Sequence, residues 1–258
     1  MDNNKIMQIL DKDPFYIKLI ENPTEEMIVK AVRKNGSILK YINNPSLKIQ
    51  WEALKESVWS IEYIENPTEE MCLYAVERAW NTLKFIKNPS EKVIKKAVEI
   101  KGWAIQYVKN PSIELQILAI EKDWDSIQYI KEPMEEIQLL AVEKYFAAIK
   151  YINNPTLKVK EKAVINNAEA ILYIKDINYE TKIIFIKDNI EVVKYLKDID
   201  INIVKEIVKE KISAEAIDKN YLINFIKCES LPIDKIKFIY NYGSKMAKRI
   251  LVDYKLSF

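Results

Sequence analysis

The chain has 258 residues, of which 49% are apolar and 30% charged, a composition typical of a folded protein with a sizeable core. Its 40 basic and 38 acidic residues leave a net charge of only +2. A protein that coats DNA, or an acidic mimic of nucleic acid, carries a strong field of one sign, so the charge favours neither class.

Several residue types that common chemistry needs are missing. Histidine is absent, which removes the commonest general base and metal ligand. Gly36, Gly102 and Gly243 stand alone and form no phosphate-binding loop. Cys72 and Cys228 lie far apart and have no zinc-site spacing. We therefore expect a protein that is not an enzyme and that holds no cofactor or metal.

No apolar run reaches the roughly 18 to 20 residues that span a bilayer. The N-terminal sequence MDNNKIMQILDKDPF also lacks a basic segment followed by an apolar one, as a signal peptide would have. The sequence therefore predicts a cytoplasmic protein with no membrane association.

Residues 1–22 predict an N-terminal cap, with an opening helix and a second helix that starts at Asp13-Pro14. From residue 23 the sequence recurs every 22 residues, as the positions of successive prolines show: Pro23, Pro45, Pro67, Pro89, Pro111, Pro133 and Pro155. Six of them belong to an Asn-Pro-Ser/Thr motif, which we interpret as the end of one helix and the start of the next. A period of this length is typical of solenoids, in which each unit is stable only against its neighbours.

The first half of each repeat predicts an amphipathic α-helix. Its apolar positions follow an i, i+4, i+5 spacing, of which Met27, Ala31 and Val32 are the first example. The middle position is always alanine: Ala31, Ala53, Ala75, Ala97, Ala119, Ala141 and Ala163. We expect another helix to approach closely at this small residue.

The second half of each repeat is short and carries an aromatic column: Tyr41, Tyr63, Phe85, Tyr107, Tyr129, Tyr151, Tyr173 and Tyr195. Its isoleucines and tyrosines are compatible with a strand, but a short helix is favoured. Small residues such as Ser60 and Ala104 stand three positions before the rings, as i, i+3 packing in a helix requires.

The repeat weakens after residue 175, where Ile177 and Ile199 replace the prolines, and it is lost from Asn220 onward. The sequence thus predicts an all-α protein, a right-handed α-solenoid of about eight to nine short helix pairs with helical caps. We expect a single domain over residues 1–258, with a cap at 1–22, repeats at 23–219 and a C-terminal helical cap at 220–258 split at Leu231-Pro232.

The architecture resembles that of HEAT and armadillo-type α-solenoids, with a unit of about half their usual length. More closely, residues 66–90, NPTEEMCLYAVERAWNTLKFIKNPS, resemble tandem 22-residue Asn-Pro-Ser/Thr helical repeats of bacterial and phage proteins. The resemblance covers residues 13 to 200. It implies a binding scaffold, including a role as a phage or mobile-element inhibitor of a host defence system, and it supplies no catalytic residues.

Three groups of residues are candidate binding residues. A row on the second helices is expected to be exposed: Lys40, Glu62, Lys84, Gln106, Gln128 and Lys150. Four tryptophans near the turn between the paired helices either form an apolar binding edge or fill gaps in the packing: Trp59, Trp80, Trp103 and Trp124. A C-terminal basic patch contains Lys245, Lys248 and Arg249.

The leading interpretation is a scaffold for protein–protein interaction through the repeat surface, with a protein partner. The alternative is a helical-repeat protein that binds nucleic acid or a nucleotide, either as a sequestering protein or as a DNA glycosylase-like solenoid. For the glycosylase, Trp124 between Asp123 and Asp125 is the nearest cluster of suitable residues. Because the net charge is almost zero, we favour the protein partner.

Overall fold

The computed structural model describes residues 2–256, and every regular element among them is helical. These residues form two compact units, of which the first ends at Ile130 and the second begins at Lys131. The all-α prediction is confirmed, and a strand in the second half of the repeat is excluded. Residues 1 and 258, at which the expected caps begin and end, lie outside the described residues.

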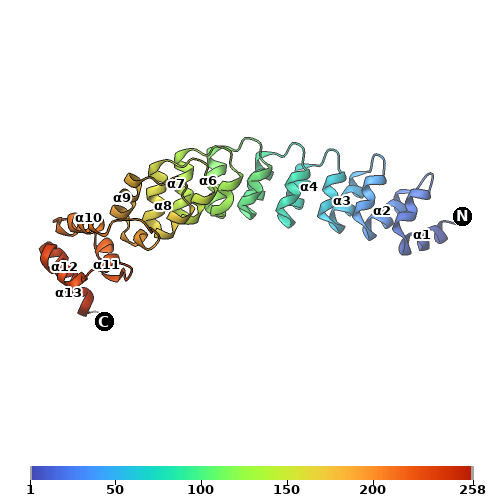
Figure 1. Cartoon of the computed structure of the whole chain (residues 1–258). Helices are drawn as coiled ribbons and strands as arrows, with labels where there is room; N and C mark the ends of the chain where they lie inside the picture. The colour runs from blue at the N-terminus through green and yellow to red at the C-terminus, as the bar shows by residue number, and fades with distance from the viewer. Residues whose placement is uncertain (1, 257–258) are drawn as a thin grey trace. The chain divides into compact units, whose positions relative to one another are not determined.

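The first unit consists of α-helices that each precede a shorter 3₁₀-helix (Figure 1). The α-helices are α1 (Asn3–Lys12), α2 (Glu25–Lys34), α3 (Leu47–Glu56), α4 (Glu69–Arg78), α5 (Glu91–Ile100) and α6 (Ile113–Lys122). The 3₁₀-helices are η1 (Pro14–Leu19), η2 (Gly36–Tyr41), η3 (Val58–Tyr63), η4 (Trp80–Phe85), η5 (Gly102–Tyr107) and η6 (Trp124–Tyr129). Successive pairs pack against each other, α-helix on α-helix and 3₁₀-helix on 3₁₀-helix.

The second unit continues the pairs and then changes to α-helices alone. Its pairs are α7 (Glu135–Lys144) with η7 (Phe146–Tyr151), α8 (Leu157–Asn166) with η8 (Ala168–Tyr173), and α9 (Tyr179–Asp188) with η9 (Ile190–Lys194). The helices α10 (Ile201–Ser213), α11 (Lys219–Lys227), α12 (Lys235–Tyr242) and α13 (Lys245–Leu256) follow without a 3₁₀ partner. Leu231 and Pro232 lie between α11 and α12.

Residues 2–22 contain a complete helix pair, α1 and η1. Leu10 in α1 and Ile17 in η1 stand one period before Val32 and Leu39, and all four side chains are at most 2% exposed. Asp13 caps η1 by accepting a hydrogen bond from the Phe15 N–H, with Pro14 as the first helical residue. The helix start expected at Asp13-Pro14 is therefore confirmed.

The Ser/Thr of the repeat motif, not the proline, caps the α-helix that follows the motif. Thr24, Ser46, Thr68, Ser90, Ser112 and Thr156 each accept a hydrogen bond from the N–H three residues later. The proline lies just before this cap, outside the helix. The asparagine before it takes the left-handed conformation at Asn44 and Asn154, with φ of 44° and 51°, which asparagine tolerates better than most residues.

The apolar columns predicted from the repeat form the core. All seven alanines of the middle column are 0% exposed. Their role in close helix approach is visible at Gly102 in η5, where an added Cβ would lie 2.3 Å from the Ala119 carbonyl oxygen of α6. The short second helices are 3₁₀-helices of five or six residues, which return the chain from one α-helix to the next. In such a helix residues i and i+3 eclipse, which places the small residues Ser60, Ala104, Ser126, Ala148 and Ala170 beneath the rings three positions later.

Within residues 2–256, none of the helices combines the length and the apolar character that crossing a bilayer requires.

Candidate binding surface

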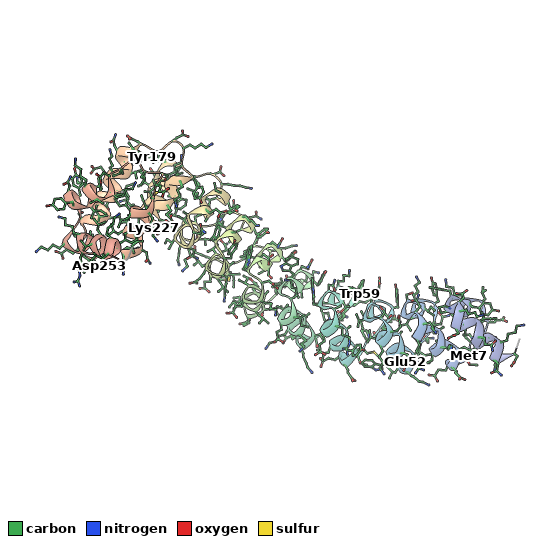
Figure 2. All side chains as sticks on the ribbon, turned by 90° about the horizontal axis from the view of Figure 1, so that it is seen from below. Met7, Glu52, Trp59, Tyr179, Lys227 and Asp253 are labelled. Carbon is green, nitrogen blue, oxygen red and sulfur yellow. The ribbon has the colours of Figure 1, made fainter. Side chains whose placement is uncertain are left out.

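The predicted polar row lies on the 3₁₀-helices, always at the fifth residue. Lys40, Glu62, Lys84, Gln106 and Gln128 belong to the first unit and Lys150 to the second, and all six residues are exposed. Figure 2 shows Trp59 of η3 at one edge of the ribbon and Glu52 of α3 at the opposite edge. The 3₁₀-helices and the α-helices thus present two different faces to solvent in the first unit.

The lysines of the row lie over the rings of the aromatic column. Lys40 Nζ is 4.8 Å from the Tyr41 ring centroid, and Lys84 Nζ is 4.7 Å from that of Phe85. Lys84 also lies 5.7 Å from the ring of Trp59 in the preceding repeat. Such cation–π contacts restrict the lysine side chain while its charge still reaches solvent.

The glutamines of the row are held by hydrogen bonds to their own 3₁₀-helices. Gln106 Nε2 donates to the Trp103 carbonyl oxygen at 2.9 Å, and Gln128 Nε2 donates to the Asp125 carbonyl oxygen at 2.9 Å. Lysines and glutamines of the row therefore have defined orientations, although they are exposed.

Trp59, Trp80 and Trp103 pack against the aromatic column of the following repeat. Trp59 contacts Phe85, Trp80 stacks on Tyr107 and Trp103 contacts Tyr129, with ring centroids 6.1, 6.1 and 6.0 Å apart. Trp80, Trp103 and Trp124 are half-buried, whereas Trp59 is 42% exposed. These ring contacts favour the packing interpretation for Trp59, Trp80 and Trp103, and Trp59 also offers an exposed edge.

The carboxylates beside Trp124 link neighbouring repeats. Asp123 accepts hydrogen bonds from Lys101 Nζ and from the Gly102 N–H, both at 2.7 Å. Asp125 accepts a hydrogen bond from Trp103 Nε1, also at 2.7 Å. These bonds join η6 and its preceding residue to η5 and its preceding residue. Both carboxylates named for a glycosylase-like reaction therefore take part in holding two repeats together.

The C-terminal basic residues lie on α13 in the second unit. Lys245, Lys248 and Arg249 are exposed, and their i, i+3, i+4 spacing places them on one side of the helix. Lys248 Nζ lies 5.4 Å from the Tyr240 ring centroid. Arg249 shares a hollow with Glu215 and Asp253, so two acidic residues lie around the end of this patch.

One residue of the row was missed from the sequence. Lys18 stands one period before Lys40, and its Nζ lies 3.7 Å from the Tyr41 ring centroid. Extending the period backward by one step would have found it, since η1 follows the same pattern as the later 3₁₀-helices. With Lys18, every 3₁₀-helix of the first unit, from η1 to η6, contributes one residue to the row, and we call these six residues the 3₁₀ row.

No protein-family model, curated protein or solved structure matches the chain. The protein is a helical-repeat protein on the evidence of its own helix pairs.

Proposed function

We propose that the protein is a non-enzymatic scaffold that binds a folded protein partner through the 3₁₀ row. The observation that carries this proposal is the combination of exposure and fixed orientation along consecutive repeats. Lysines restrained over rings and glutamines bonded to carbonyl groups lose little further freedom on binding, so a partner gains more from each contact. Exposed Trp59 adds a residue type that is enriched among the strongest contacts of protein interfaces.

The charge pattern of the row favours a protein over nucleic acid. Glu62 interrupts the lysines, and Gln106 and Gln128 are neutral, so the row lacks the continuous positive charge that tracks a phosphate backbone. A mixed row instead suits a protein surface with alternating charges. The engagement of Asp123 and Asp125 in links between repeats weighs against the glycosylase-like alternative.

The narrower role, inhibition of a host defence system by a phage or mobile element, rests on the resemblance of the repeats to those of bacterial and phage proteins. In such a role the partner is a host defence protein in the bacterial cytoplasm.

Reversing charges in the row tests the proposal. The triple variant Lys40→Glu, Glu62→Lys and Lys84→Glu is compared with wild type in affinity capture from host cells, with and without phage infection, followed by mass spectrometry. We expect a partner that wild type retains and the variant loses. As a matched control, Lys55→Glu, Glu70→Lys and Lys122→Glu reverse the same charges at exposed positions on α-helices and should retain the partner.

A gel shift at low salt separates the two classes of partner. Non-specific nucleic-acid binding is strongest at low salt, so we expect no shift of single-stranded or duplex DNA or RNA there. If nucleic acid shifts with wild type and not with the row variant, the partner of the 3₁₀ row is nucleic acid and not a protein. Equal capture of every partner by wild type and both variants would exclude the 3₁₀ row as the binding surface.

A further inference from the structure

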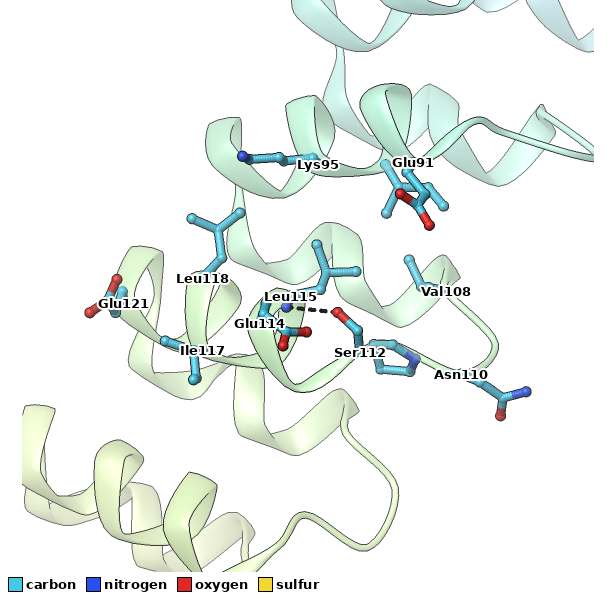
Figure 3. Close-up of a pocket in the computed structure, with 12 residues that line it drawn as sticks. Glu91, Lys95, Val108, Asn110, Ser112, Glu114, Leu115, Ile117, Leu118 and Glu121 are labelled. Atoms are coloured by element: carbon cyan, nitrogen blue, oxygen red, sulfur yellow. Dashed lines mark hydrogen bonds between the residues drawn. The ribbon is translucent and has the colours of Figure 1, made fainter.

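A groove of about 750 Å³ lies between α5 and α6, on the α-helical side of the first unit (Figure 3). Its apolar lining includes Leu115, Ile117 and Leu118 from α6. Its charged lining is mostly acidic and consists of Glu91, Glu114 and Glu121 with one ammonium group, that of Lys95. The 3₁₀ row lies on other elements, so this surface is separate from the one proposed above.

Three other junctions between neighbouring α-helices, α2–α3, α4–α5 and α7–α8, share a contact near the helix N-termini. A glutamate in the first turn accepts a hydrogen bond from the N-cap hydroxyl of the next α-helix and pairs with a lysine two residues after that cap. The contact joins Glu25 to Ser46 and Lys48, Glu69 to Ser90 and Lys92, and Glu135 to Thr156 and Lys158. The hydroxyl distances are 2.8, 2.6 and 2.6 Å, and the lysine distances are 3.9, 3.4 and 3.5 Å.

The same three junctions have a second ion pair near the other end of the helices. It joins residues 19 positions apart, namely Arg33 with Glu52, Glu77 with Lys96, and Glu143 with Lys162, at 2.6, 3.4 and 3.1 Å. The α2–α3, α4–α5 and α7–α8 junctions are thus closed at both ends by opposite charges.

The α5–α6 junction lacks both closing contacts because two cations are replaced. Glu114 stands where the first contact has lysine, and it lines the groove together with Glu91, which carries the same charge. Leu118 stands where the second contact has Lys96 or Lys162, which leaves Glu99 of α5 opposite an apolar side chain. Among the described residues no ion pair joins a residue of α5 to a residue of α6, and the ion pair nearest to the junction links their C-cap residues, Lys101 and Asp123, at 2.7 Å.

The first-turn carboxylate of α6 is held in its charged form. A hydrogen bond from its own backbone N–H and another from the Ser112 hydroxyl lower the pKa of Glu114. The Ser112 hydroxyl, which in the closed junctions would reach the preceding glutamate, thus bonds within its own repeat. Glu91 and Glu114 therefore form an acidic end of the groove.

The groove also exposes part of the core column. Leu115 is half-buried, whereas the other members of its column are at most 4% exposed: Met27, Ile49, Met71, Val93, Ile137 and Val159. Together with Ile117 at 36% exposure, it gives the groove an apolar floor between acidic ends. Apolar surface of this kind is stabilised when a partner covers it.

We propose that this groove binds a basic amphipathic segment of a partner protein, whose cations take the places of the two lysines that the junction lacks. Its apolar side chains cover Leu115 and Leu118, and a lysine or arginine at each end reaches a carboxylate of the lining. Glu91 and Glu114 line the groove at the N-terminal ends of the helices, and Glu121 of α6 lines it at the other end. Charge complementarity with an apolar centre is the pattern of a helix bound in a groove, and the same carboxylates repel phosphates and acidic peptides.

The test uses the full chain and a displayed library of short helical peptides. Peptides are selected on wild type after removal of those that bind the double variant Glu114→Lys, Leu118→Lys, which restores the lysines of the closed junctions. We expect the enriched peptides to carry apolar residues at i, i+3 or i+4 with Lys or Arg on both sides. Fluorescence anisotropy of a selected peptide should show at least about tenfold weaker binding to the double variant.

Controls separate a specific groove from general charge or unfolding. Glu70→Lys changes the position of α4 that corresponds to Glu114 two periods earlier, and it should leave the affinity within about twofold. The double variant should keep its circular dichroism spectrum and melt at a higher temperature, because it gains two ion pairs. The row variant Lys40→Glu, Glu62→Lys, Lys84→Glu should bind the peptide as wild type does, so the two proposals fail or hold separately.

Three results would overturn the inference. The first is a selection without enriched sequences, and the second is enriched peptides that lack flanking cations. The third is equal binding of the selected peptide to wild type and to the Glu114→Lys, Leu118→Lys variant.

Discussion

Asp188, the last residue of α9, carries a carboxylate oxygen that is buried without a hydrogen-bond partner. Burial, reinforced by the nearby charge of Glu161 and only partly offset by Lys211, raises the pKa of Asp188 to about 6 from 3.8. Its position at a helix C-terminus also disfavours the ionised carboxylate, because the partial charge of the helix is negative there. The ionised carboxylate therefore destabilises the folded protein at neutral pH.

Replacing Asp188 by Asn should stabilise the protein in a pH-dependent way. A raised folded-state pKa means that the folded state binds the proton more tightly, so the destabilisation is absent below about pH 4 and complete above about pH 6. Because the side chain is only half-buried, we expect a gain of about 1 to 2 kcal/mol at pH 7.5 and almost none at pH 4. Urea unfolding at the two pH values measures both quantities.

Asp198→Asn is the matched control, since it removes the same charge from an exposed loop of the same unit. It should change the free energy of unfolding by less than about 0.5 kcal/mol at either pH. An equal effect of the two substitutions, or a gain from Asp188→Asn that persists at pH 4, would show that burial of this carboxylate is not the cause.

At the scale of the element, α7 departs from the other repeat helices at its start. Met134 occupies the N-cap, where it makes no side-chain hydrogen bond and is 56% exposed. Ser or Thr caps each of the repeat helices α2 to α6 and α8. The first-turn N–H groups of α7 thus lack the partner that the motif supplies elsewhere.

Met134→Thr should therefore stabilise the protein by about 1 kcal/mol, as a restored N-cap typically does. The reverse change, Thr156→Met in α8, removes the cap of the Val159 N–H and the hydrogen bond to Glu135. Thr156→Met should lower the free energy of unfolding by at least as much as Met134→Thr raises it. Thermal and urea unfolding measure both, and a destabilising Met134→Thr would mean that the Met134 side chain contributes more through packing than a cap would.

The sequence predicted the repeat α-helices α2 to α8 well because a buried stripe, a proline and, in all but α7, a Ser/Thr cap agree with one another. It did not distinguish 3₁₀ from α in the second helices, since six residues with i, i+3 spacing fit either. The 3₁₀ row followed from the period alone. The groove was not predicted from the sequence. It follows from the loss of ion pairs between residues 19 and 23 positions apart, and these pairs can be recognised only once the structure shows which residues are in contact.

At the scale of the whole molecule, the helix pairs within each unit pack mainly on the pair before and the pair after. The aromatic contacts also join neighbouring repeats. Trp59 contacts Phe85 of the next repeat, and Trp80 stacks on Tyr107 of the repeat after its own. The free energy of unfolding of such a chain is approximately the sum of the intrinsic stabilities of its repeats and the energies of the interfaces between neighbouring repeats. Removing one complete period should therefore preserve the fold, whereas removing part of a period should not.

Deleting residues 68–89 tests this expectation, because it removes α4 and η4 and joins Pro67 directly to Ser90 as a new Pro-Ser motif. The alanine and aromatic columns stay in phase, so Trp59 meets Tyr107 in place of Phe85 and Ala53 is followed by Ala97. We expect unchanged helicity per residue by circular dichroism and a melting temperature lower by several degrees. Deleting only residues 68–78 puts the columns out of phase and should abolish cooperative melting. If deletion of the complete period unfolded the protein as the shorter deletion does, contacts beyond neighbouring repeats would have to carry the fold.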